Sequence, residues 1–382
     1  MRFLVIVSLL LIFVDATAQD SVVVKQNFRI SGYCKYLSSV DFKPSFRSPE
    51  YIQLLHNRVN MSYAPSERLR FKAEIRNRLF GSRGVGDNYR FATGLRNPHQ
   101  YFDLQKSMVL NDDFLAHVSV ERLFADWQGR RFNMRLGRQR INWGIATLWN
   151  PNDIFNSYNF LDFDYEERAG VDALFLKYFS GANSDLDFGF SFDEKNRWVL
   201  ASRYFFNAGG YDWQVLAGSY EGSATLGAGW AGNIGEAGFK GELQYFSKRD
   251  SLASQLNATL EISHLLSKAW FVNTGLLYSK AGQNSALPGS EKFNLQISPR
   301  QPMPGRYSFF AGIQKEFSSL FSVSFQSVYS PGLGLVILLP QLSWSVADNL
   351  NAELFWQSFY QASEIYSGEL GQAGFLRLRY SF

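Results

Sequence analysis

The sequence predicts an all-β fold: a transmembrane antiparallel β-barrel of about 18 strands. Three observations support this prediction. Apolar and polar residues alternate along much of the chain, nothing after an apolar leader is apolar enough to cross a membrane as a helix, and the last segment ends at an aromatic residue. Sixteen strands remains an alternative, because glycines between residues 209 and 232 blur the strand breaks.

Period-two alternation is clearest in residues 69–79. One face of this segment is apolar and carries Leu69, Phe71, Ala73, Ile75 and Leu79, while the other is charged and carries Arg70, Lys72, Glu74, Arg76 and Arg78. A soluble β-sandwich also alternates in this way. Aromatic residues at strand ends, such as Trp270 and Tyr278, favour a barrel whose apolar face meets lipid.

The expected strands lie near 28–36, 54–64, 69–80, 113–124, 131–142, 170–179, 185–193, 197–206, 211–220, 223–231, 236–247, 253–263, 269–280, 306–316, 320–330, 334–345, 349–360 and 373–382. Short connections follow the even-numbered strands, and longer ones, around 37–53, 81–112, 143–169, 281–305 and 361–372, follow odd-numbered strands. This alternation is typical of short periplasmic turns and longer external loops. Residues 335–339 are apolar on both faces, which predicts an apolar patch in the lumen or contact with a plug.

The N-terminus has the pattern of an export signal. A positive Met1-Arg2 pair precedes an apolar run to Val14, and Ala16-Thr17-Ala18 is a small-residue cleavage site. We therefore expect residues 1–18 to be removed and residues 19–382 to form a single barrel with no second domain. The only cysteine, Cys34, lies past the cleavage point, so neither an internal disulfide nor lipidation at that site is expected.

The last strand places Leu376, Leu378, Tyr380 and Phe382 on one face and charged or polar residues on the other. It resembles the C-terminal signature that the barrel-assembly machinery of diderm bacteria reads. The resemblance implies insertion into the outer membrane by that machinery, with lipids as partners.

The segment most distinctive in composition is the third external loop, residues 143–169, together with the strand before it. Its acidic residues are Asp153, Asp162, Asp164, Glu166 and Glu167, and they are interleaved with aromatic residues. A loop that floated in water would not need so many aromatics, so we expect it to fold inward. Before it, Arg138 and Arg140 continue the lipid-facing parity of their strand, and a bulge at Gly137 would turn them to the lumen. The alternative is that both arginines already lie above the membrane.

The acids of this loop are expected to face a basic wall. By parity the wall comprises Arg29, Arg58, Arg70, Lys72, Arg76, Arg78, Arg131, Arg135, Arg377 and Arg379, on neighbouring strands of the closed barrel. Opposed rows of charge across a narrow pore set ion selectivity. The alternative is that the loop acids and wall arginines only neutralise each other and hold the loop in place.

Gly137, Arg138, Gln139, Trp143 and Gly144, followed by Asn150-Pro151 and Asp153, resemble segments of porin-like outer-membrane barrels of diderm bacteria. The resemblance covers this segment and is supported at both ends of the chain. It implies a channel for passive diffusion of small hydrophilic solutes, constricted by loop 143–169. A structural or assembly barrel with a closed lumen is the first rival, and a surface enzyme is the second. The solute, the sign of selectivity and a homotrimeric assembly stay open.

No enzyme, cofactor, bound metal or nucleic-acid partner is expected. The chain has no G-x-S-x-G or H-E-x-x-H motif, and its four histidines, His56, His99, His117 and His264, form no catalytic pattern. His117 with Glu121 is read as pore lining. Asp162, Asp164 and Glu166 have the spacing and oxygen ligands for Ca²⁺, but a solvated or arginine-paired loop is the preferred interpretation.

Overall fold

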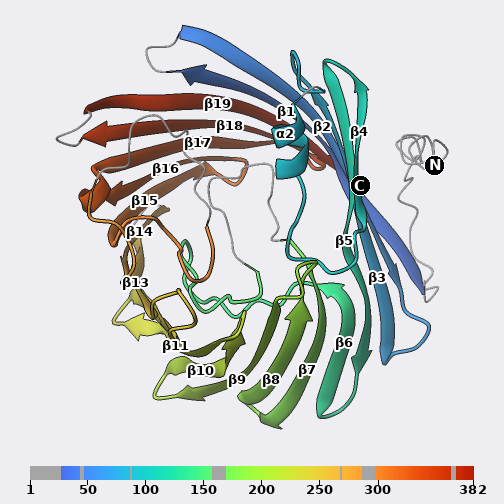
Figure 1. The fold of residues 1–382 in the computed structure, drawn as a ribbon, viewed down its shortest axis with the longest axis vertical. Helices are drawn as coiled ribbons and strands as arrows, with labels where there is room; N and C mark the ends of the chain where they lie inside the picture. The colour runs from blue at the N-terminus through green and yellow to red at the C-terminus, as the bar shows by residue number, and fades with distance from the viewer. Residues whose placement is uncertain are drawn as a thin grey trace.

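The computed structural model shows a closed antiparallel β-barrel with chain segments inside it (Figure 1). It describes residues 27–43, 47–86, 88–156, 169–266, 269–285, 297–362 and 367–382. The signal segment 1–18 and the loop residues 157–168 therefore lie outside the described part of the chain. One sheet of 19 strands contains the barrel, and 18 of these strands form the closed wall.

The wall strands follow one another around the barrel in chain order, with β4 as an additional strand against β5. Their bounds are β1 (Phe28–Lys43), β2 (Arg47–Tyr63), β3 (Leu69–Gly81), β4 (Gln105–Asn111), β5 (Phe114–Gln128), β6 (Phe132–Gln139), β7 (Val171–Gly181), β8 (Ser184–Phe192), β9 (Trp198–Ala208), β10 (Tyr211–Tyr220), β11 (Ser223–Ile234), β12 (Ala237–Phe246), β13 (Gln255–Leu266), β14 (Trp270–Ser279), β15 (Tyr307–Ser318), β16 (Phe321–Ser330), β17 (Leu335–Ala347), β18 (Leu350–Ala362) and β19 (Ser367–Ser381). A short helix, α2 (Tyr89–Gly94), and a 3₁₀ turn, η3 (Pro331–Leu333), lie in connections.

The barrel closes between its first and last strands. β1 pairs with β19 from Tyr33 opposite Ser381 to Phe42 opposite Gln372. Gly32 and Phe382 exchange two backbone hydrogen bonds of 2.9 Å at the end of this seam. A Cβ at Gly32 would lie 2.8 Å from the ring of Phe382 and 2.2 Å from a backbone oxygen, so the seam needs a glycine there.

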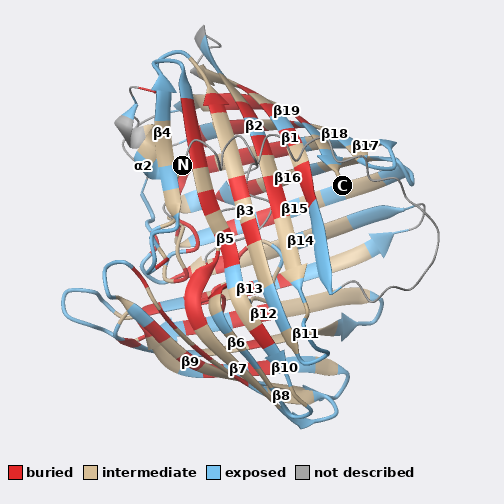
Figure 2. Ribbon diagram, turned by 90° about the vertical axis from the view of Figure 1, so that its right-hand side faces the viewer, coloured by how far each residue is buried: buried red, intermediate tan, exposed pale blue. Residues whose placement is uncertain are grey.

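The alternation of the sequence corresponds to two different surroundings. Outward-facing Leu376, Leu378, Tyr380 and Phe382 are between 39% and 52% exposed, whereas Arg377 between them is buried. Figure 2 shows the same change of burial along the strands of the wall. An apolar outer surface over a polar inner one suits a barrel whose outer solvent is lipid.

Among the residues that the structure describes, no helix is both long and apolar enough to span a bilayer.

The predicted strand pattern is confirmed, and the 16-strand alternative is wrong. Each of the 18 predicted segments overlaps one wall strand. Two of the predicted long loops are also wrong: β1 and β2 extend into 37–53, and β18 and β19 extend into 361–372. The sequence prediction missed β4, which forms within the second long connection and pairs with the start of β5.

We refer to the two ends of the barrel as the long-loop end and the short-turn end. The connections 82–113, 140–170 and 280–306 lie at the long-loop end. Here β6 is short and ends at Gln139, where it pairs with Val171 of β7. β4 pairs with Phe114 to Ser119 of β5, above the part of β5 that pairs with β6. β4 thus continues the sheet beside β5 where β6 has left it.

Candidate functional site

The chain leaves the wall after β6 and runs inside the barrel, as Figure 1 shows for the green segment that crosses its interior. Residues 140–156, which we call the lumen segment, are the described part of the third long loop. Ile141, Trp143, Ile154 and Phe155 are all buried, and they pack in one cluster with inner-wall residues from β7 to β12. The described part of this loop therefore packs against the inner wall, and an inward fold of the whole loop 143–169 stays a prediction.

The middle of the lumen segment reaches a second part of the wall. Trp149 is 4% exposed and packs with Met303 and with inward residues of β14 to β17, among them Leu335 and Ile337. Its ring lies 6.3 Å from that of Phe310, edge to face. The apolar stretch 335–339 is thus a plug contact, which was one of its two predicted explanations.

Two wall carboxylates bind the backbone of the lumen segment. Glu242 on β12 is fully buried and accepts hydrogen bonds from the backbone N–H of Ile145 at 2.5 Å, Ala146 at 2.7 Å and Asn152 at 2.9 Å. Glu261 on β13 accepts from the backbone N–H of Thr147 at 2.6 Å and from its hydroxyl. Each carboxylate therefore uses both of its oxygens on this segment.

Uncharged contacts complete the attachment. The side-chain amide of Gln214 on β10 donates to the Trp143 carbonyl at 2.7 Å, and the Asn152 side chain donates to the Ala228 carbonyl at 2.8 Å. Wall glycines leave the room that the segment needs: a Cβ at Gly189 would lie 2.6 Å from the Phe155 ring. The lumen segment is thus fitted to the β7–β13 side of the barrel.

A row of basic side chains lies on another part of the inner wall. Directly paired positions on five neighbouring strands, β19, β1, β2, β3 and β5, carry Arg379, Lys35, His56, Arg78 and His117. We call these five residues the basic row. Lys35 and His117 have no exposed surface. Sequence parity had placed the two arginines on the lumen wall and His117 in the pore lining, but it had missed Lys35.

Carboxylates on the same wall neutralise the rows beside the basic row. Arg58 pairs with Glu74, which also lies 2.5 Å from Lys72. Arg76 lies 3.9 Å from Glu121. These acids belong to strands and not to the loop that was predicted to face the arginines.

Toward the short-turn end, wall arginines also pair with carboxylates on neighbouring strands. Arg135 donates to Asp126 at 3.3 Å and stacks over Phe124 at 4.8 Å. Arg377 pairs with Glu353 and stacks over Phe355. Arg70 is exposed at the start of β3. The described part of the predicted constriction is therefore basic on one wall, but much of its charge is balanced locally.

Arg138 does not enter the lumen. β6 pairs with β5 and with β7 without a register shift at Gly137, so the bulge predicted there is wrong. A register shift occurs instead in the pairing of β3 with β5, between Glu74 and Ile75. Arg138 keeps the parity of the exposed Leu136 and yet is 2% exposed. It forms two hydrogen bonds, of 2.9 and 2.8 Å, to Asp172 of β7. Arg138 occupies an outward-facing position of its strand, but its charge is paired with Asp172 and the pair is buried under other residues. An arginine is therefore stable at this position.

The cover comes from the second long connection. The backbone N–H groups of Tyr101 and Phe102 donate to Asp172 at 2.8 and 2.9 Å, and the Phe102 carbonyl accepts from Arg138. Arg140, the next predicted arginine, is partly buried at the start of the lumen segment.

The predicted loop acids divide into two groups. Asp153 is 1% exposed and accepts from the Trp143 backbone N–H at 3.4 Å, so it helps to fold the lumen segment. The other group lies outside the described residues and comprises Asp162, Asp164, Glu166 and Glu167. The alternative of a Ca²⁺ site concerns three of these same residues. Among the residues with described positions, no group of His, Cys, Asp and Glu is arranged to hold a metal ion.

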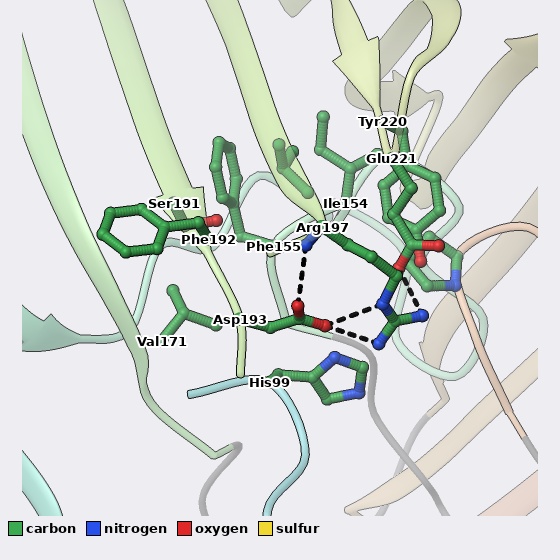
Figure 3. A pocket seen from close by; sticks show the side chains of 12 residues that line it. His99, Ile154, Phe155, Val171, Ser191, Phe192, Asp193, Arg197, Tyr220 and Glu221 are labelled. Carbon is green, nitrogen blue, oxygen red and sulfur yellow. Dashed lines mark hydrogen bonds and ion pairs between the residues drawn. The ribbon is translucent and has the colours of Figure 1, made fainter. Parts of the chain in front are cut away.

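A small cavity of about 30 Å³ lies at the long-loop end, where five connections meet (Figure 3). Arg197, between β8 and β9, contacts Asp193 at 2.5 Å and Glu221 at 3.1 Å. His99, from the connection between α2 and β4, lies beside them. Burial, and secondarily the charge of Arg197, lower the pKa of His99 below its usual value, so His99 is neutral near pH 7.

No protein-family model matches the sequence, and no curated protein resembles it in sequence. The fold, in contrast, matches solved structures of Occ outer-membrane channels. OpdL of Pseudomonas aeruginosa matches with a TM-score of 0.59 and 12% identity over 93% of this chain and 99% of that one. This chain has their fold.

Two further structures agree. OccK11 (OpdR) of Pseudomonas aeruginosa matches with a TM-score of 0.56 and 11% identity, covering 93% of this chain and 96% of that chain. OccAB1 of Acinetobacter baumannii matches with a TM-score of 0.55 and 11% identity, covering 94% and 97%. Matches along nearly the whole of both chains indicate the same barrel fold.

Proposed function

We propose that this protein is an outer-membrane channel for passive diffusion of small hydrophilic solutes, narrowed by the loop 143–169. The observation that carries the proposal is the lumen segment, bound to the β7–β13 side of the interior while the basic row lies on the β19–β5 side. A barrel of this strand number is wide enough for an aqueous channel, and an inward loop narrows it. The fold shared with Occ channels supports the same function.

We further propose that the channel prefers anions. Arg379 and Arg78 are partly exposed and bring two formal positive charges to the basic row, on either side of the paired positions of Lys35 and His56. On the opposite side, Glu242 and Glu261 direct their oxygens to the lumen segment. A low-dielectric wall strengthens the field of the charges on its surface, so a solute with a carboxylate or another anionic group is favoured.

A cavity of about 310 Å³ at the short-turn end suits the vestibule of such a channel. It is lined largely by polar residues, including Asn351, Glu353, Arg377 and Arg379. In this proposal the short turns face the periplasm and the long loops face the outside.

Export and assembly follow as further proposals. Residues 1–18 act as a signal peptide that is removed, and Leu376, Leu378, Tyr380 and Phe382 are read by the barrel-assembly machinery during insertion among outer-membrane lipids. Homotrimer formation stays a prediction from the sequence.

The rival function is a structural barrel with a closed lumen. The lumen segment gives this rival some support, because it packs on two parts of the wall. Trp149 packs on β14–β17, while Ile141 and Phe155 pack on residues of β7 to β12. An enzyme has less support, since its case rests on isolated histidines, and His117, which is hydrogen-bonded to Ser107 at 2.8 Å, has no exposed surface.

The reversal potential under a salt gradient tests the proposal. We expect anion selectivity in the natural protein and a shift toward cations in Arg78→Gln, because one cation leaves the basic row. Lys315→Gln is the matched control: it removes one positive charge from a side chain that stacks over Trp270, on the parity of the outward-facing Ile313 and Phe317. Equal reversal potentials in the natural protein and Arg78→Gln would contradict the proposed role of the row.

A further inference from the structure

The most specific contacts inside the barrel are those of two carboxylates that the sequence analysis did not single out. Glu242 and Glu261 occupy neighbouring strands, and both face inward on the β10–β13 side. Glu242 is fully buried and Glu261 is 5% exposed. A buried carboxylate is costly unless hydrogen bonds replace its water, so its partners identify its role.

Those partners come almost entirely from the backbone of the lumen segment. The consecutive N–H groups of Ile145, Ala146 and Thr147 point to the two carboxylates, and the N–H of Asn152 returns to Glu242. Glu242 thus binds both ends of a short turn, and Glu261 binds its middle. The turn is closed internally by the Asn150 side chain, which donates to the Ala146 carbonyl.

We infer that Glu242 and Glu261 are positioning residues that fix the lumen segment against the wall and so set the width of the pore. Hydrogen bonds to a charged acceptor are roughly twice as strong as neutral ones, and these carboxylates replace backbone partners that the segment lacks inside the barrel. The attachment of the lumen segment is inferred from its contacts alone. Its effect on the width of the pore rests on the proposed channel function.

This role differs from that of a selectivity charge. A carboxylate that faces solvent in a pore acts on passing ions through its field. Glu242 has no exposed surface, and donors from the lumen segment occupy both of its oxygens. Removing its charge should therefore change where the segment lies and how often it moves, beyond any effect on ion preference.

Hydrogen exchange of the refolded, full-length mature barrel in detergent micelles tests the attachment without requiring conduction. In Glu242→Gln and Glu261→Gln, an NH₂ group replaces one accepting oxygen and faces the donors. We expect the peptide that contains residues 141–156 to exchange about tenfold faster or more. Glu316→Gln is the control, because it removes the same charge from the wall of the short-turn cavity and should leave this peptide unchanged.

Single-channel recordings then test the consequence. We expect frequent conductance fluctuations in both Glu→Gln variants and steady conductance in Glu316→Gln. A folded Glu242→Gln barrel with natural exchange in residues 141–156 would overturn the inference. If the natural protein does not conduct while the exchange result holds, the attachment stands and the channel function fails, so the two failures are distinguishable.

Heat-modifiable migration in SDS verifies folding before either measurement. If Glu242→Gln does not reach the folded state, Glu261→Gln and Thr147→Val carry the test. The latter deletes only the hydroxyl that donates to Glu261, and it should raise exchange at residues 145–147 by a smaller factor than Glu261→Gln. Unchanged exchange in both of these folded variants would equally overturn the inference.

Discussion

Substitution of Asp172 by Asn tests how the wall tolerates an arginine with outward parity. Asp172 is the only carboxylate hydrogen-bonded to Arg138 among the described contacts, and the two side chains are 7% and 2% exposed. The variant leaves a buried guanidinium without a counter-charge. It also weakens the acceptor for the N–H groups of Tyr101 and Phe102, which hold the covering segment.

The magnitude follows from this burial. Removing one partner of a buried ion pair costs about 3–5 kcal/mol, whereas replacing both partners by apolar groups of similar size costs little. We therefore expect Asp172→Asn to lower the free energy of unfolding by about 3–5 kcal/mol. The double variant Arg138→Met with Asp172→Leu should lose less than Asp172→Asn, because it leaves no buried charge, although it also removes the acceptor of the Tyr101 and Phe102 N–H groups.

Guanidinium unfolding of the refolded barrel, followed by tryptophan fluorescence, measures these energies. Asp212→Asn is the control, because Asp212 is exposed on β10 and its bond to Asn207 is also exposed. We expect the control to change stability by about 0.5 kcal/mol or less. Equal losses in Asp172→Asn and in the double variant would refute the view that an uncompensated charge, and not lost packing, sets the cost.

Two further predictions concern the interior and the long-loop end. Trp149→Ala removes a ring that is 4% exposed, so we expect a loss of about 3–5 kcal/mol in unfolding free energy by the same assay, and a loss below about 1 kcal/mol would contradict the packing described. The lowered pKa of His99 means that the unfolded loop binds a proton more readily than the folded one, so loop packing is favoured above the usual pKa of 6.5 and weakens as pH falls below it. Limited proteolysis of residues 82–113 should therefore accelerate at about pH 5.5 relative to neutral pH, and His99→Gln should remove this pH dependence. Acceleration of the same size in His99→Gln would assign the effect to other groups.

The barrel could be predicted because the outer and inner faces of its wall have different surroundings. Lipid outside and polar groups inside give each strand a period of two, and this period marked all 18 wall strands, including the arginine-bearing face of β3. Strand ends were less certain, since the β1–β2 and β18–β19 hairpins extend beyond the alternating stretches. β4 gives a weaker signal because it lies within a long loop and covers only residues 105–111.

The site depends on contacts between residues that lie far apart in the chain, and a single sequence does not show which residues these are. The contact of Glu242 with Ile145 joins residues 97 positions apart, and only the closed barrel brings them together. The basic row likewise requires the register of five strands, which is why Lys35 was missed. Arg138 was assigned to the lumen because its cover, Tyr101 and Phe102, comes from another loop. Glycines inside strands, such as Gly189, were the one available sign of a close approach at the wall.

Single-channel conductance of the refolded protein in a planar bilayer tests the central claim most directly. The account predicts steady, discrete conductance steps and, under a salt gradient, a reversal potential of the sign for anion preference. A barrel that is verifiably folded by heat-modifiable migration but conducts no ions would contradict it and would favour the closed structural barrel.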